Sequence, residues 1–157
     1  MAELIKRIRI TYKIKILGMS ETAFPIEIIS LSREIADLKS TEDSHKIIEA
    51  FKAHKNAFVR RVIVTAIRFM GQNSSLKYIG YLLEKMEDED DWVKYDVAWT
   101  LGELDCNDKR VINSLTHLAE EYFHLSKEEL EKIEPNDASI YAKKRAAESL
   151  HELSMRF

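Results

Sequence analysis

The chain of 157 residues contains few of the residues that interrupt or cross-link a fold: four glycines, two prolines and one cysteine. The scarcity of glycine and proline argues against a β-sandwich or barrel and favours helices joined by short turns. The single cysteine, Cys106, excludes an internal disulfide and is typical of a reducing compartment. There is no apolar run long enough to cross a bilayer and no signal-peptide pattern, so we expect a cytoplasmic protein.

The residues that are abundant also indicate a helical protein. Apolar residues make up 45% of the chain and charged residues 32%, which is an ordinary balance for a globular domain. The charges are unevenly placed: residues 52–68 carry five basic and no acidic residues, whereas residues 84–108 carry ten acidic and two basic ones. The acidic stretch should repel nucleic-acid phosphates and attract a basic partner.

One helical pattern occurs three times. FVRRVIVTAIRFMG (58–71) aligns with WVKYDVAWTLGELD (92–105) at an offset of 34, and YAKKRAAESLHELS (141–154) is a third copy at an offset of 49 from the second. HLSKEELEKIEPND (124–137) accounts for the added length. The apolar slots of the middle copy are Val93, Val97, Ala98, Leu101 and Leu104. Similar segments precede each copy, so each repeat is predicted to be helix, turn, helix.

The pattern V-R-x-x-A-x-x-A-L-G, which VKYDVAWTLG matches well, resembles HEAT repeats, especially the short ones of phycobilin-lyase-type proteins. The resemblance covers about residues 40–154. It implies an all-α, right-handed α-α superhelix, a HEAT-like solenoid of about four helix pairs in one domain, 1–157. The implied parts are a degenerate first unit at 1–39 and repeats at 40–71, 72–105 and 106–154, the last with the insertion 124–137.

The same resemblance implies a ladder in which an aspartate before each inner helix pairs with a basic residue of a neighbouring repeat. Asp88 and Asp137 occupy the acidic slot, and His54 replaces it in the first copy. The basic slots hold Arg60, Lys94 and Lys143. Lysine cannot form the bidentate fork that arginine makes, so two of these slots depart from the family pattern.

The first 17 residues fit two secondary structures. RIRITYKIKI alternates strictly between polar and apolar residues, which is typical of a strand that pairs with a partner or a second copy. As a helix, the segment has one face with Leu4, Ile5, Ile8, Tyr12 and Ile16 and an opposite face with Ile10, Ile14 and Leu17. The repeat favours the helix, and 24–39 is predicted to be the helix that follows it.

Two aromatic residues of the middle copy, Tyr95 and Trp99, lie between the apolar slots at a spacing of four. The other copies hold polar residues there, so we expect this stripe to face solvent on the concave side of the solenoid. Tyrosine and tryptophan often dominate interface energies. The alternative is that they cover a neighbouring helix or the insertion. The predicted partner-binding residues are Tyr95, Trp99, Arg61, Thr65, Arg68, Asp96, Lys144 and Arg145.

No nucleophile, phosphate-loop or metal motif stands out, so we expect no catalysis, metal or cofactor. The residues His117, Glu121 and His124 could share a helix face, but a polar helix edge is the simpler interpretation. We expect a protein-binding module; by analogy of fold, it would suit an inhibitor or toxin-neutralising immunity protein. The alternatives are an alkylpurine-type DNA glycosylase, using Asp96 beside the aromatics, and a phycobilin lyase.

Overall fold

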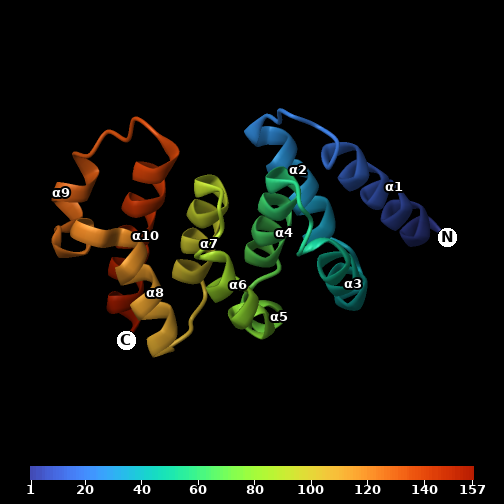
Figure 1. Cartoon of the computed structure of the whole chain (residues 1–157). Coiled ribbons are helices and arrows are strands. Elements are labelled where there is room, and N and C mark those ends of the chain that lie inside the picture. The colour runs from blue at the N-terminus through green and yellow to red at the C-terminus, as the bar shows by residue number, and fades with distance from the viewer. The chain divides into compact units, whose positions relative to one another are not determined.

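The computed structural model describes all residues, 1–157, and contains helices and no β-strand (Figure 1). The α-helices are α1 (Ala2–Leu17), α2 (Pro25–Ala36), α3 (Thr41–Phe51), α4 (Ala57–Phe69), α5 (Gln72–Ser75), α6 (Ile79–Lys85), α7 (Asp91–Glu103), α8 (Lys109–Ala119), α9 (Lys127–Glu131) and α10 (Ala138–Arg156). Two 3-10 helices are η1 (Leu76–Tyr78) and η2 (Glu120–His124). The prediction of an all-α chain is confirmed. None of the helices combines the length and hydropathy that a bilayer-spanning segment requires.

The helices form two compact units, Met1–Ser74 and Ser75–Phe157. The first unit contains α1 to α4, and the second contains α6 to α10. The division falls close to the predicted boundary between the repeats 40–71 and 72–105. Each unit therefore holds two of the predicted pairs of outer and inner helices.

In the first unit α4 is the central helix, and α2 packs along its length (Figure 1). Every residue from 62 to 67 is buried, although several of them are β-branched and have only modest helix propensity, so packing outweighs propensity here. Asn56 caps α4 by accepting the Phe58 N–H at 2.8 Å. Its side-chain amide also donates to the carbonyl oxygens of Gly18 and Ser20, which fixes the turn after α1 to the start of α4.

The segment of uncertain secondary structure forms α1, so the strand alternative is wrong. The face turned into the unit carries Ile10, Ile14 and Leu17. The larger apolar face points outward, and Leu4, Ile8, Tyr12 and Ile16 are 50, 62, 65 and 45% exposed. The helix therefore buries the smaller of its two apolar faces.

In the second unit α10 packs mainly against α7 and α8 (Figure 1). The backbones of α7 and α10 approach closely where Gly102 faces Ser149. A Cβ added to Gly102 would overlap the Ser149 side chain. The Ser149 hydroxyl donates to the Ala98 carbonyl oxygen at 2.8 Å, which joins the two helices at the same point.

The apolar slots of the repeat are buried in the helices that the repeat predicts. Val93, Val97 and Leu101 of α7 and Leu104 directly after it are buried, and the matching positions of the other two copies are mostly buried as well. The outer helix α8 departs from the pattern, because Ile112 is 37% exposed. The insertion contains α9 and packs onto α10: the Lys144 ammonium donates to the Ile133 carbonyl oxygen at 3.1 Å.

Candidate functional site

Four aromatic rings gather where α7 meets α10, and we call them the aromatic cluster: Trp92, Tyr95, Trp99 and Tyr141. Tyr95 is the centre of this cluster. Its ring lies edge-on to Trp92 at 5.5 Å, to Trp99 at 5.8 Å and to Tyr141 at 6.3 Å, and Trp92 and Tyr141 are 5.1 Å apart. Edge-to-face pairs at such distances add stabilisation beyond their buried area. The cluster is therefore an ordered surface feature.

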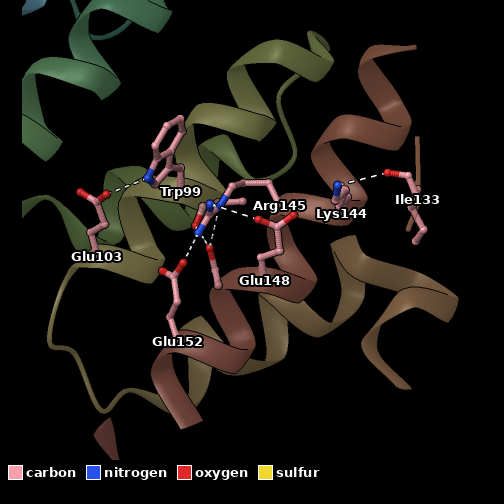
Figure 2. Close-up of polar contacts among 9 residues, drawn as sticks. Trp99, Glu103, Ile133, Lys144, Arg145, Glu148 and Glu152 are labelled. Carbon is pink, nitrogen blue, oxygen red and sulfur yellow. Dashed lines mark hydrogen bonds and ion pairs between the residues drawn. The ribbon is translucent and has the colours of Figure 1, made fainter. Parts of the chain in front are cut away.

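Arg145 of α10 joins the cluster to a set of carboxylates. Figure 2 shows its guanidinium between Trp99 and two glutamates of the same helix. The guanidinium carbon lies 5.2 Å from the centre of the Trp99 ring, a cation–π geometry. The guanidinium donates to Glu152 at 2.6 Å and to Glu148 at 3.3 Å. These contacts hold Arg145 in one place and largely neutralise its charge.

The Trp99 side chain is held on its polar side as well. Its indole N–H donates to the Glu103 carboxylate, one helical turn further along α7, at 2.7 Å (Figure 2). Glu103 itself is exposed, and Trp99 is half-buried. A ring that contacts Tyr95, Arg145 and Glu103 at once has little rotamer freedom left to lose on binding a partner.

The predicted site residues divide between the two units. Arg61, Thr65 and Arg68 belong to the first unit, and the others belong to the second. The residues with partly exposed side chains are Tyr95, Trp99, Arg61, Arg68, Lys144 and Arg145. These six stay predicted contact residues.

Two of the predicted site residues are buried, which corrects the expectation that they face solvent. Thr65 is 2% exposed because it lies in the stretch of α4 in which every side chain is covered. Asp96 is 4% exposed because it shares a helix face with Val93 and Thr100, both of which are fully buried. Neither side chain is exposed for first contact with a partner.

The prediction missed Trp92 and Tyr141, although the sequence contains a signal for both. They align with each other at the offset of 49, and Phe58 aligns with them at the offset of 34. Every copy of the inner helix therefore has an aromatic residue directly before its first apolar slot. In the second unit two of these aromatic residues meet, because α7 and α10 pack side by side.

The residues of the predicted ladder have several local partners. Asp88 accepts the Asp90 N–H at 2.9 Å, and His54 accepts the Asn56 N–H at 3.0 Å. His54 thus takes the same backbone hydrogen bond as Asp88 in the equivalent turn. Arg60 donates to the carbonyl oxygens of the turn before its own helix.

In the third copy the acidic slot has a different role, because Asp137 caps α10. Its carboxylate accepts from the Ser139 hydroxyl at 2.6 Å and from the Ile140 N–H at 3.0 Å, and these bonds lower the pKa of Asp137. Lys143 pairs with Glu120 at 2.8 Å, a contact that raises the pKa of the lysine and lowers that of the glutamate. The third copy thus departs from the ladder at both slots.

The side chains that could have formed a metal site do not lie on one helix face. Helix α8 ends at Ala119, and Glu120 has a φ of 49°, so His117 is separated from Glu121 and His124 by a break in the helix. No group of three histidine, cysteine or acidic side chains is placed to hold a metal ion. Cys106 is partly buried, and burial raises the pKa of its thiol, which disfavours the reactive thiolate.

The candidate site is therefore a surface of aromatic rings and fixed charges. It offers apolar area, edge and face contacts for a cation or another ring, and carboxylates at its margin. No known protein family, curated protein or solved structure matches the chain.

Proposed function

We propose that the chain is a non-catalytic protein-binding module built as a short HEAT-like solenoid. In this proposal α4, α7 and α10 are the inner helices of a right-handed α-α superhelix and line its concave side. Three observations support it: the three copies of one sequence pattern form these helices, an outer helix precedes each of them, and their apolar slots are mostly buried. Stacked helix pairs of this kind commonly bind partners on the concave side.

The observation that carries the proposal is the preorganised aromatic cluster with Arg145. Tyrosine, tryptophan and arginine are the residue types that most often dominate binding energy at protein interfaces. Tyr141 is 39% exposed, and Tyr95 and Trp99 are partly exposed, so a partner can reach their rings. Because the side chains already hold one another in place, a partner would order little more on binding.

The charges around the cluster indicate the chemistry of the partner. Glu103, Glu148 and Glu152 surround Trp99 and Arg145, so carboxylates outnumber the cations there. A protein that presents an apolar group beside lysine or arginine would complement this surface, whereas a phosphate backbone would be repelled. An inhibitor or a toxin-neutralising immunity protein is the role that this proposal favours.

The test is a quantitative affinity purification from cells that express the tagged chain. We compare the wild type with the double variant Tyr95→Ala/Trp99→Ala and measure the partners that each recovers. The double variant is expected to lose its main partner by about tenfold or more, because two central contact residues are truncated. Circular dichroism confirms that the variant is folded.

The matched control is Phe123→Ala, which removes a 45% exposed aromatic side chain from the same unit but outside the cluster. This variant should recover the partner as well as the wild type does. If the wild type and the double variant recover every protein equally, the aromatic cluster is not the binding surface. If Phe123→Ala loses the same partner, the effect is not specific to the cluster.

A further inference from the structure

The first unit carries a second surface that the aromatic cluster does not include: the outer face of α1. Leu4, Ile8, Tyr12 and Ile16 recur every four residues along this helix, and each is exposed by nearly half or more. Side chains at this spacing form the straight ridge that fits between the side-chain rows of a second helix. An exposed apolar ridge of this length marks an interaction site in a folded protein.

A groove of about 560 Å³ runs along one side of this ridge, between α1 and α3. Its apolar walls combine the α1 ridge with Ile47 and Phe51 of α3. The charged residues that line it are all basic: Arg7, Lys15 and Lys46. Lys15 is exposed and has no carboxylate partner. Arg7 pairs with Asp43 of α3 at 3.3 Å and Lys46 pairs with Glu42 at 3.5 Å, so Lys15 is the rim cation that no carboxylate neutralises.

The other side of the ridge differs in charge. A groove of about 420 Å³ between α1 and α2 is lined by Glu27 and Glu34 as well as by Lys13. Lys13 and Glu34 form an ion pair at 2.8 Å, so the cation on this side is already neutralised. Glu27 on the α2 side has no basic partner, and Lys15 on the α3 side has no acidic one, so the unpaired charge is negative on one side of the ridge and positive on the other.

We propose that the α1–α3 groove binds an acidic amphipathic helix from a partner protein. The apolar stripe of that helix would lie against the ridge, and an aspartate or glutamate at its flank would pair with Lys15, because Arg7 and Lys46 already have carboxylate partners. The ridge spacing favours a helix as the occupant, and the rim determines the sign of its charge. This surface belongs to the unit Met1–Ser74 and the aromatic cluster to Ser75–Phe157, so either proposal can fail without the other.

Two other occupants fit the charges less well. An anionic bilayer would contact both sides of the ridge at once and would meet Glu27 and Glu34 on the α2 side. A second copy that placed α1 against α1 would bring two strongly basic helices together, because α1 has five basic residues and one acidic residue. A helix lying in the α1–α3 groove avoids both conflicts.

The experiment selects the partner helix from a displayed peptide library. The library contains helices about as long as α1, with leucine fixed along one stripe and glutamate, lysine, glutamine or alanine allowed at the flanking positions. The full chain is the target. We expect the selected peptides to be enriched in glutamate at the flanks, and their affinity to fall by about tenfold or more for Ile8→Glu, which places a carboxylate in the centre of the ridge.

The matched control is Ile112→Glu, which introduces the same charge at an exposed isoleucine of α8 and should leave binding unchanged. Lys15→Glu should shift the selected flanks away from glutamate. Selection without a preference for acidic flanks, or equal affinity for the wild type and Ile8→Glu, would overturn the proposal. The proposal would also be overturned if no selected peptide binds and the chain instead binds phosphatidylserine vesicles, or self-associates in sedimentation velocity. In either case Ile8→Glu should abolish the vesicle binding or the self-association.

Discussion

Helices α1 and α7 both carry large apolar side chains on two faces, but they differ in what covers the second face. On α7 that face is contacted by Tyr141 and Arg145 of α10. On α1 the second face has no such cover, and Ile8 and Tyr12 are more than 60% exposed. Helical spacing thus identifies an apolar stripe, whereas the neighbouring helix determines whether that stripe is packed or exposed.

The largest expected effect separates the two faces of α1. Ile14 is fully buried, so Ile14→Ala should lower the free energy of unfolding by about 3 kcal/mol through lost burial and a residual cavity. Ile8→Ala removes the same atoms from the exposed face and should change it by less than about 0.5 kcal/mol. Urea unfolding of the two variants measures the difference. Similar losses for both would mean that the outer face of α1 is covered in solution.

The second prediction tests the close approach of α7 and α10, which brings Tyr141 and Arg145 over the outer stripe of α7. In Gly102→Ala the new Cβ would overlap Ser149 and push α10 away from α7. Overpacking costs about 1–3 kcal/mol and the better helix propensity of alanine returns up to about 1 kcal/mol, so we expect a net loss of about 1–2 kcal/mol. Thermal unfolding measures this loss, and near-ultraviolet circular dichroism reports the rearranged tryptophans.

Its control is Gly80→Ala in α6, where an added Cβ meets nothing within 4 Å. This variant gains helix propensity without a clash and should be neutral or slightly more stable. An unchanged stability and aromatic spectrum for Gly102→Ala would show that α7 and α10 do not need their close approach.

Much of this architecture could be predicted from the sequence because the repeat preserves spacing. The copies at 58–71, 92–105 and 141–154 overlap the helices α4, α7 and α10, and the slots at Val93, Val97 and Leu101 are buried as expected. The start of α10 could not be obtained in this way. Alignment places its cap at residue 139, but Asp137 caps the helix two residues earlier because Ser139 and Ile140 donate to its carboxylate.

The candidate site was harder to predict, because exposure depends on packing and not on residue type alone. Thr65 and Asp96 are polar and were expected at the surface, yet neighbouring side chains cover both. Both faces of α1 are apolar, so no pattern within the helix could show which one is buried. Tyr141 could have been found from its alignment with Trp92, although its contact with Tyr95 depends on how α7 and α10 pack.

The third prediction, with a smaller effect, compares a side-chain pair between α7 and α10 with a pair on the outer face of α1. A double-mutant cycle with Trp99→Ala and Arg145→Ala should give a coupling of about 0.5–1 kcal/mol, because the guanidinium lies over the indole ring. The matching cycle with Ile8→Ala and Tyr12→Ala should give less than about 0.5 kcal/mol, as is usual for exposed neighbours at this spacing. Equal couplings in urea unfolding would remove the distinction between the packed stripe and the exposed one.

The smallest effect concerns how the helices begin. α1 has no side-chain cap, whereas Asp137 caps α10, the helix that carries Tyr141 and Arg145. The Ser139 hydroxyl and then the Ile140 N–H lower the pKa of Asp137 in the folded chain. As the pH falls, Asp137 therefore takes up a proton in the unfolded chain before it does so in the folded chain. Its contribution to the free energy of unfolding is complete above its ordinary pKa of about 4 and is lost as the pH falls through the lower folded pKa.

Asp137→Asn keeps a capping side chain but does not titrate. Relative to this variant, the wild type should be more stable at neutral pH, and its advantage should shrink as the pH falls from about 5 to about 3. Urea unfolding at several pH values measures this difference. Ser139→Ala removes the main cause of the lowered pKa of Asp137 and should reduce the pH dependence while retaining the cap. A pH-independent difference between wild type and Asp137→Asn would mean that Asp137 acts only as a neutral cap would, and that the start of α10 owes nothing to the charge of its capping residue.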